Sequence, residues 1–333
     1  VVVYVNHLSN YHGIYSIQGN LLVSCGGLKH LNPDIIITIG GQTGDYSIYN
    51  ALNLTKNTEH WRVCEDGNVV NTYNRLNKIF ECPAFYFFNR MKKDMQVDHS
   101  YYEEWKNMNS TMNYNVEVPF SNLYVAQQLY KDIPQNSIMN FAILNSLRSW
   151  SYFPLNTSIQ GYANVAAFGI DGCNSMLIGE SMNTNEFCFI VTGDLAFFYD
   201  MNALGIRHIK NNVRILLVNN NGGAEFKIMT RNWTDNVNVD NFISANGHNG
   251  NAKGWAENCG FKYISAKNKE EFSNVKNEFI NENFRPILFE VFTEEVDEVV
   301  AMSEFIGKNK IVKSGDKIKA VVSSIAVSYT HLR

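Results

Sequence analysis

The chain has 333 residues, of which 45% are hydrophobic and 18% are charged, and its formal net charge is −4. A chain of this length can form two domains that each bury a core. The negative charge and the lack of a basic stripe argue against a nucleic-acid partner, and the apolar runs are only as long as strands, so no membrane span is expected.

The first third of the chain alternates short apolar strands with helical stretches. Residues 34–39 predict a buried strand that ends at a glycine pair, and residues 46–53 predict the helix that follows it. Two further short strands and a partly helical connector are expected at 61–63, 78–80 and 98–112. We therefore assign residues 1–115 to a first α/β domain, the central domain, with its connector.

After Pro119 the alternation becomes regular. Ser121 is a candidate N-cap for a helix that continues to residue 131. The later predicted strands are 139–144, 160–163, 187–191, 213–218, 261–265 and 286–292, and the later predicted helices are 173–181, 252–259 and 269–281. Fully apolar strands that alternate with helices are typical of parallel sheets covered on both faces. The predicted fold is therefore α/β with two doubly wound domains and mainly parallel sheets, the second domain spanning residues 116–326.

The six cysteines show no CxxC spacing, so we expect free thiols in a reducing, cytoplasmic environment. The first residues lack the basic region and the cleavage site of a signal peptide. Residues 327–333 resemble an adapter-derived read-through and are expected to be an artefactual tail. The sequence is expected to be a fragment of a longer protein.

Polar residues follow two neighbouring buried strands. Gly193-Asp194 follows the first, and Asn219-Asn220-Asn221-Gly222-Gly223 follows the second. Because the carboxyl ends of parallel strands face one crevice, the carboxylate of Asp194 and the carboxamide of Asn220 are expected to meet there. With the backbone carbonyl of Gly222 they offer the oxygen ligands that Mg²⁺ prefers. The alternatives are a helix N-cap for Asp194 and a tight turn for the run that follows the second strand.

This pattern resembles the thiamine diphosphate fingerprint, which pairs a Gly-Asp with an Asn-Asn after the next strand. Three segments together are similar to the 2-succinyl-5-enolpyruvyl-6-hydroxy-3-cyclohexene-1-carboxylate (SEPHCHC) synthases. They are Asn164 with Gly169-Ile170-Asp171-Gly172, Gly193-Asp194-Leu195 with Tyr199-Asp200-Met201-Asn202, and Val218-Asn219-Asn220-Asn221-Gly222-Gly223. The resemblance implies a transferase or lyase that uses thiamine diphosphate and Mg²⁺ to decarboxylate a 2-oxoacid and join the product to an acceptor.

The resemblance also implies roles for individual residues. Asp194, Asn220 and Gly222 would hold Mg²⁺, and the backbone N–H groups at the start of the next helix would bind the diphosphate. Ile170 would support the bent cofactor and Asp171 would lie near it, the alternatives being a core residue and a helix cap. The implied cofactor-binding residues are Ser146, Asn164, Gly169, Ile170, Asp171, Gly193, Asp194, Leu195, Ala196, Asn220 and Gly222.

Two substrate-binding arginines of the family have no match here. Trp150 stands four residues after Ser146, where the family has the first arginine, and Val165 stands at the second position, with Arg148 out of register. Arginine binds carboxylates through a planar fork that neither tryptophan nor valine can replace. We therefore expect an enzyme with an altered acceptor, such as a sugar or another intermediate.

The family's activating glutamate belongs to a pyrimidine-binding domain that is expected to lie outside this chain and to act across a subunit interface. No catalytic residue is therefore assigned, the fragment alone is expected to be inactive, and a homodimer or a dimer of dimers is expected. Glu225 would face the cofactor, whereas His248 is expected to be a solvated loop residue. Two alternatives stay open: an acetolactate-synthase-like enzyme or simple 2-oxoacid decarboxylase, and a non-catalytic subunit for cofactor binding or assembly.

Overall fold

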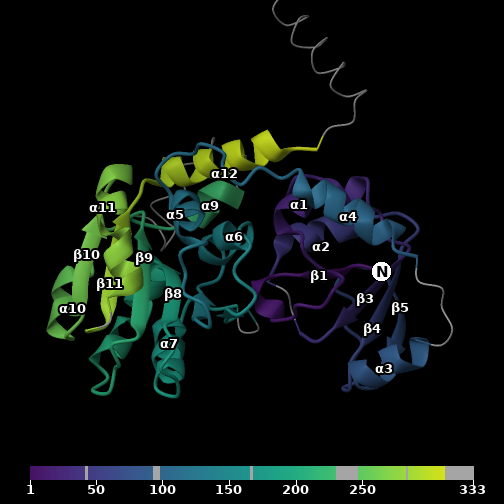
Figure 1. The fold of residues 1–333 in the computed structure, drawn as a ribbon, viewed down its shortest axis with the longest axis horizontal. Coiled ribbons are helices and arrows are strands. Elements are labelled where there is room, and N and C mark those ends of the chain that lie inside the picture. Colours follow the sequence, from purple (N-terminus) through teal and green to yellow (C-terminus); the bar gives the residue numbers. More distant parts are fainter. Residues whose placement is uncertain (42–43, 93–97, 166–167, 230–246, 283, 312–333) are drawn as a thin grey trace, which may run out of the picture.

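The computed structural model describes residues 1–41, 44–92, 98–165, 168–229, 247–282 and 284–311 (Figure 1). Within these residues strands alternate with helices, and every paired strand runs parallel to its neighbour. The predicted α/β class with parallel sheets is confirmed. Residues 327–333, the predicted tail, lie outside the described residues.

The larger sheet has six strands and occupies the C-terminal half of the chain (Figure 1). Its three central strands are buried along nearly their whole length, because helices cover both faces of the sheet. In their order across the sheet the six strands are β10 (Lys262–Ala266), β11 (Ile287–Phe292), β9 (Val213–Asn219), β8 (Cys188–Gly193), β6 (Ile138–Phe141) and β7 (Gln160–Ala163).

Alternate strand residues enter two separate hydrophobic clusters, one on each face of this sheet, as the period of two along a strand requires. One face is covered by α7 (Cys173–Ser181), α8 (Asp194–Tyr199) and α10 (Lys253–Asn258). The other carries α5 (Asn122–Leu129), α6 (Asn145–Ser151) and α11 (Lys269–Asn281). Short elements α9 (Ala224–Met229) and η3 (Met201–Gly205) follow β9 and α8 respectively.

The N-terminal half contains two smaller parallel sheets. One pairs β1 (Val3–Val5) with β2 (Ser16–Gln18), and the other has the order β3 (Ile35–Ile39), β4 (Glu59–Val63) and β5 (Leu76–Phe80). The helices here are η1 (His7–Ser9), α1 (Asn20–Ser24), η2 (Gly27–Lys29), α2 (Tyr46–Asn53), α3 (Ala84–Met91) and α4 (Ser100–Ser110). The strand at 34–39 was predicted to be buried, but on the edge strand β3 the side chains of Ile35, Ile37 and Ile39 are 44%, 38% and 50% exposed.

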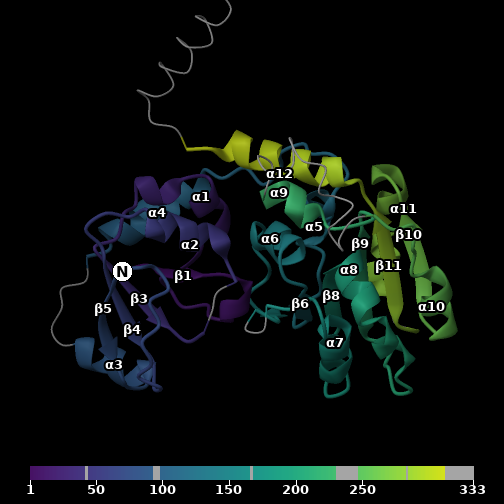
Figure 2. The same cartoon turned by 180° about the vertical axis from the view of Figure 1, so that it is seen from behind.

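The two halves lie side by side, and α12 (Glu295–Asn309) lies over the C-terminal half, with its C-terminal end reaching α1 of the other half (Figures 1 and 2). Helix α12 contacts α5 and α9 in one half and α1 in the other. The ring of His7 from η1 stacks on Phe141 of β6 at a centroid distance of 5.4 Å, and its Nε2 lies 2.9 Å from the carbonyl oxygen of Trp150. A single hydrophobic cluster therefore continues from one half into the other.

Several element bounds agree with the sequence predictions. The helices 46–53, 173–181 and 269–281 and the strand 160–163 have the predicted ends. The Ser121 hydroxyl accepts the Tyr124 N–H at 3.2 Å, which makes Ser121 the predicted N-cap of α5. Helices α1, α3, α6, α9 and α12 were not predicted. The domain boundary near residue 115 stays a prediction. Among the described helices none is long and apolar enough to cross a membrane.

Candidate active site

The predicted site residues lie along one edge of the six-stranded sheet. Four neighbouring strands, in the order β9, β8, β6 and β7, end there. Asn220 follows β9, Asp194 follows β8, Ser146 lies in the helix after β6, and Asn164 follows β7. Because all four strands are parallel, their carboxyl ends form one edge, where ligands of such sheets bind. The structure therefore gathers segments that are up to 74 residues apart in the chain (Ser146 to Asn220).

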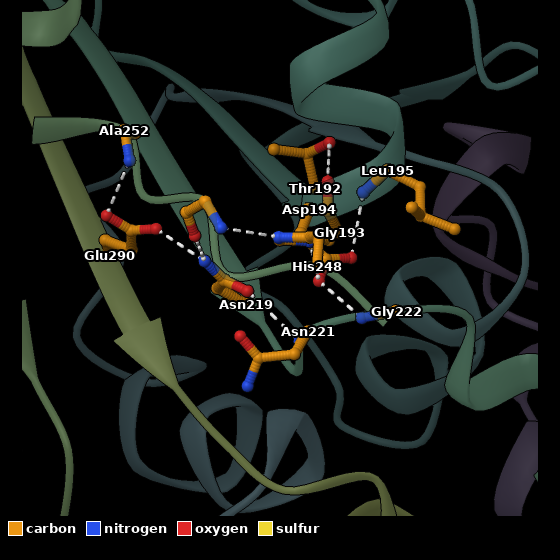
Figure 3. Close-up of polar contacts among 11 residues, drawn as sticks. Thr192, Gly193, Asp194, Leu195, Asn219, Asn221, Gly222, His248, Ala252 and Glu290 are labelled. Carbon is orange, nitrogen blue, oxygen red and sulfur yellow. Dashed lines mark hydrogen bonds and ion pairs between the residues drawn. The ribbon is translucent and has the colours of Figure 1, made fainter. Parts of the chain in front are cut away.

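Asp194 is a buried carboxylate, 2% exposed, at the first position of α8. Its Oδ1 accepts the Leu195 N–H at 2.8 Å, and its Oδ2 accepts the Gly222 N–H at 2.9 Å (Figure 3). Burial raises the pKa of Asp194, and these hydrogen bonds oppose that shift. The N-cap of α8 is Gly193, so Asp194 is not the N-cap residue that the alternative interpretation expected.

Asn220 carries a buried acceptor without a partner. The residue is 8% exposed, and its Oδ1 has no hydrogen-bond partner among the described residues. An unsatisfied buried carboxamide oxygen is unfavourable, and a cation would satisfy it. The direct contact of Asp194 with Gly222 brings the three predicted metal-binding residues into one cluster. Their oxygen donors fit Mg²⁺, which is commonly held by few protein groups together with phosphate oxygens.

In the described part of the chain, this site included, no group of three or more His, Cys, Asp or Glu side chains could hold a metal ion. The Leu195 N–H already donates to Asp194, so it orients this carboxylate in the structure. Diphosphate binding by Leu195 and Ala196 stays a prediction.

The segment before α7 lies on the same side of the sheet as α8. Gly172 has a φ of +69° and is the N-cap of α7, with no side-chain cap, so Asp171 does not cap this helix. Ile170 is half-buried and packs against the hydrophobic cluster that contains Cys173 and Phe197. Gly169 precedes it. Ile170 therefore contacts the hydrophobic core, as the alternative interpretation expected, and its contact with a cofactor stays a prediction.

Trp150 and Val165, which stand where the family has its two arginines, lie in different surroundings. Trp150 is 1% exposed and part of the core, whereas Val165 is half-buried in a cleft between the two halves of the chain. Arg148 also lines this cleft, and its guanidinium binds Glu225 through two hydrogen bonds of 2.7 and 2.8 Å. Glu225 was expected to face the cofactor; in the structure it pairs with Arg148.

His248 contradicts the sequence prediction. It was expected to be a solvated loop residue, but its Nε2 lies 3.0 Å from Asp194 Oδ2, and its side chain is 25% exposed (Figure 3). Its ring packs edge-to-face against Phe198 at 5.3 Å. The two residues of this pair are 54 positions apart, and no local pattern indicated the contact. Sequence reasoning therefore missed a direct neighbour of the proposed metal ligand.

Comparison with known proteins finds similarity to bacterial enzymes named SEPHCHC synthase. The protein from Christiangramia forsetii is 33% identical over 292 residues, which cover 83% of this chain and 49% of the relative. Those from Phocaeicola vulgatus and Bacteroides thetaiotaomicron are each 30% identical, over 280 and 279 residues, covering 83% of this chain and 50% of each relative. The chain thus spans about half the length of these curated relatives. No protein-family model matches it.

Proposed function

Because the chain is a homologue of SEPHCHC synthases over most of its length, we propose that it binds thiamine diphosphate through Mg²⁺ and takes part in decarboxylation of a 2-oxoacid followed by carboligation. The observation that carries this proposal is the contact of Asp194 with Gly222, next to Asn220, whose buried carboxamide oxygen has no partner among the described residues. These are the groups that a magnesium diphosphate needs at the carboxyl edge of a parallel sheet.

Each residue of the cluster has a defined task in this proposal. The Asp194 carboxylate, the Asn220 carboxamide oxygen and the Gly222 carbonyl would hold Mg²⁺, with the diphosphate as the remaining ligand. When bound, the cofactor supplies an electron sink for the loss of CO₂ from the 2-oxoacid. The Leu195 N–H fixes the Asp194 carboxylate, and Ser146 and Asn164 at the same edge would contact the bound molecules. Because Asp194 is buried, its carboxylate would hold the ion away from bulk water.

Calorimetric titration with thiamine diphosphate, with and without Mg²⁺, tests the proposal. Metal-dependent binding is expected in the unmodified chain, and Asp194→Ala and Asn220→Ala should each abolish it. Asn221→Gly is the control, because Asn221 is the exposed neighbour of Asn220 and glycine readily adopts its φ of +62°. The proposal is wrong if no metal-dependent binding occurs in the unmodified chain, or if Asp194→Ala binds as tightly as the unmodified chain.

We further propose that the acceptor differs from that of the SEPHCHC synthases. Trp150 is buried in the core, so its position cannot present a cation to a substrate, and the Arg148 guanidinium already binds Glu225. A substrate carboxylate bound by Arg148 would therefore share the guanidinium with Glu225. Product analysis with the complete protein tests this: formation of SEPHCHC at a rate comparable with that of the Christiangramia forsetii relative would refute the altered acceptor.

The proposal includes a homodimer or a dimer of dimers, because the activating glutamate of this family is expected from a neighbouring subunit. Sedimentation velocity of the complete protein measures the assembly directly. A strictly monomeric protein that retains full decarboxylase activity would rule out this part of the proposal.

A further inference from the structure

The Asp194 carboxylate is not equally occupied at its two oxygens. Oδ2 accepts two N–H groups, from the Gly222 backbone at 2.9 Å and from the His248 ring at 3.0 Å. Oδ1 accepts one, from the Leu195 backbone at 2.8 Å. A carboxylate offers about two acceptor sites on each oxygen. Among the described residues, the remaining acceptor site is therefore on Oδ1.

The tautomer of His248 follows from its second ring nitrogen. The Gly250 N–H donates to His248 Nδ1 at 3.0 Å, so Nδ1 is the acceptor nitrogen and the ring proton of the neutral form is on Nε2. That proton points at Asp194 Oδ2. A backbone donor thus selects the form of the imidazole that can donate to the carboxylate. The edge-to-face packing on Phe198 restricts rotation of the ring.

Hydrogen bonds connect the loop that carries His248 to two core strands, β9 and β11. The His248 N–H donates to the Asn221 carbonyl at 3.0 Å, and Asn219 Nδ2 donates to the Gly250 carbonyl at 3.0 Å (Figure 3). Asn219 also donates to Glu290 of β11, a fully buried carboxylate, at 2.7 Å. The other oxygen of Glu290 accepts the Ala252 N–H at 3.0 Å. The loop is therefore held from both sides, which fixes the place of the His248 ring.

We propose that His248 is a positioning residue for the metal ligand Asp194: its Nε2–H fills Oδ2, so that Oδ1 is the oxygen that coordinates Mg²⁺. This inference rests on the proposed function. Residues that hydrogen-bond a metal ligand fix its orientation, and their loss commonly weakens metal affinity by about 10- to 100-fold. His248 would act in this way although it does not itself ligate the ion.

Titration of the chain with Mn²⁺ in the presence of thiamine diphosphate tests this role without turnover, since free Mn²⁺ is quantified by electron paramagnetic resonance. His248→Ala should weaken Mn²⁺ binding by about 10- to 100-fold. His248→Gln, which retains a side-chain N–H donor, should recover most of the loss. The near-ultraviolet circular dichroism of each metal-free variant reports whether the fold is retained.

A second measurement does not depend on a variant. Long-range ¹H–¹⁵N spectra of the His248 ring should show the Nε2–H tautomer before and after addition of Mg²⁺ and thiamine diphosphate. Ligation through a ring nitrogen after addition would overturn the inference. So would unchanged Mn²⁺ affinity in His248→Ala, or tighter affinity, which would mean that the ring competes with the ion for Oδ2. If the unmodified chain binds no Mn²⁺, the proposed function fails together with this inference; if only the variants fail to differ, the proposed function stands.

Discussion

Mild acid should destabilise the contact between the two halves of the chain through His7. This residue is 8% exposed, stacks on Phe141, and donates from Nε2 to the Trp150 carbonyl. Burial lowers the pKa of His7 from 6.5 to about 4, against the opposing effect of hydrogen bonds to backbone carbonyls. The unfolded chain therefore takes up the proton first as the pH falls below 6.5, and the native state loses stability between pH 6.5 and about 4.

The shift of His7 from 6.5 to about 4 corresponds to about 3 kcal/mol of unfolding free energy. Urea unfolding at pH 7 and pH 4, followed by tryptophan fluorescence, measures it by comparison with His7→Gln, which keeps a donor but cannot take up a proton in this range. Carboxylates contribute to the pH dependence of both the unmodified chain and His7→Gln, so the difference in pH dependence between the two proteins gives the contribution of His7. His12→Gln, at an exposed histidine, is the matched control.

The expected result is that the unmodified chain loses about 3 kcal/mol more than His7→Gln between the two pH values. His12→Gln should lose as much as the unmodified chain. If the pH dependence of His7→Gln agrees with that of the unmodified chain within about 0.5 kcal/mol, the buried neutral imidazole does not contribute and the reasoning is refuted.

Three further predictions concern the core and the cleft. Phe289→Ala should lower the unfolding free energy by about 4 kcal/mol, because this fully buried ring packs against two other phenylalanines. Phe284→Ala, at an 88% exposed ring, should change the unfolding free energy by less than about 0.5 kcal/mol. Similar effects of the two substitutions in urea unfolding would contradict the packing argument. Arg148→Met should lower the unfolding free energy by about 3 kcal/mol, since it leaves Glu225 as an unpaired, largely buried carboxylate. Adding Glu225→Leu should recover most of this loss in the same assay. A double variant that is no more stable than Arg148→Met would disprove this prediction. Cys188 should resist iodoacetamide at pH 8 in the native chain, because burial raises the pKa of its thiol to about 12, and rapid labelling found by mass spectrometry would show the thiol to be accessible.

The cluster that is proposed to bind Mg²⁺ was predictable because its geometry follows from local pattern. Buried apolar strands that alternate with helices predict parallel neighbours, and parallel neighbours bring their carboxyl ends together. Asp194 and Asn220 each follow such a strand directly, so two short segments placed them at neighbouring strand ends. The same logic holds for Ser146 and Asn164, which follow two further strands of that edge.

His248 was not predictable in this way. Its place depends on the hydrogen bonds of its loop to Asn219 and Glu290, which are tertiary contacts between segments distant in the chain. The pairing of Arg148 with Glu225 is of the same kind, since it joins α6 to α9. Helix α12 was not predicted for a different reason, because its first turn is acidic. In that turn Glu298 is buried and accepts hydrogen bonds from the Thr293 hydroxyl, the Asn122 backbone and the Asn145 side chain. A buried glutamate interrupts the apolar periodicity on which helix prediction relies.

The isoleucines of β3 have a consequence for the behaviour of the protein in solution. Ile35, Ile37 and Ile39 are 44%, 38% and 50% exposed on a strand that also forms the edge of its sheet. An edge strand presents backbone groups that can pair with another chain, and apolar side chains beside them favour such pairing. The folded chain is therefore expected to associate through this strand. Precipitation during concentration would reflect adhesion between folded molecules, and salt that strengthens apolar association would hasten it.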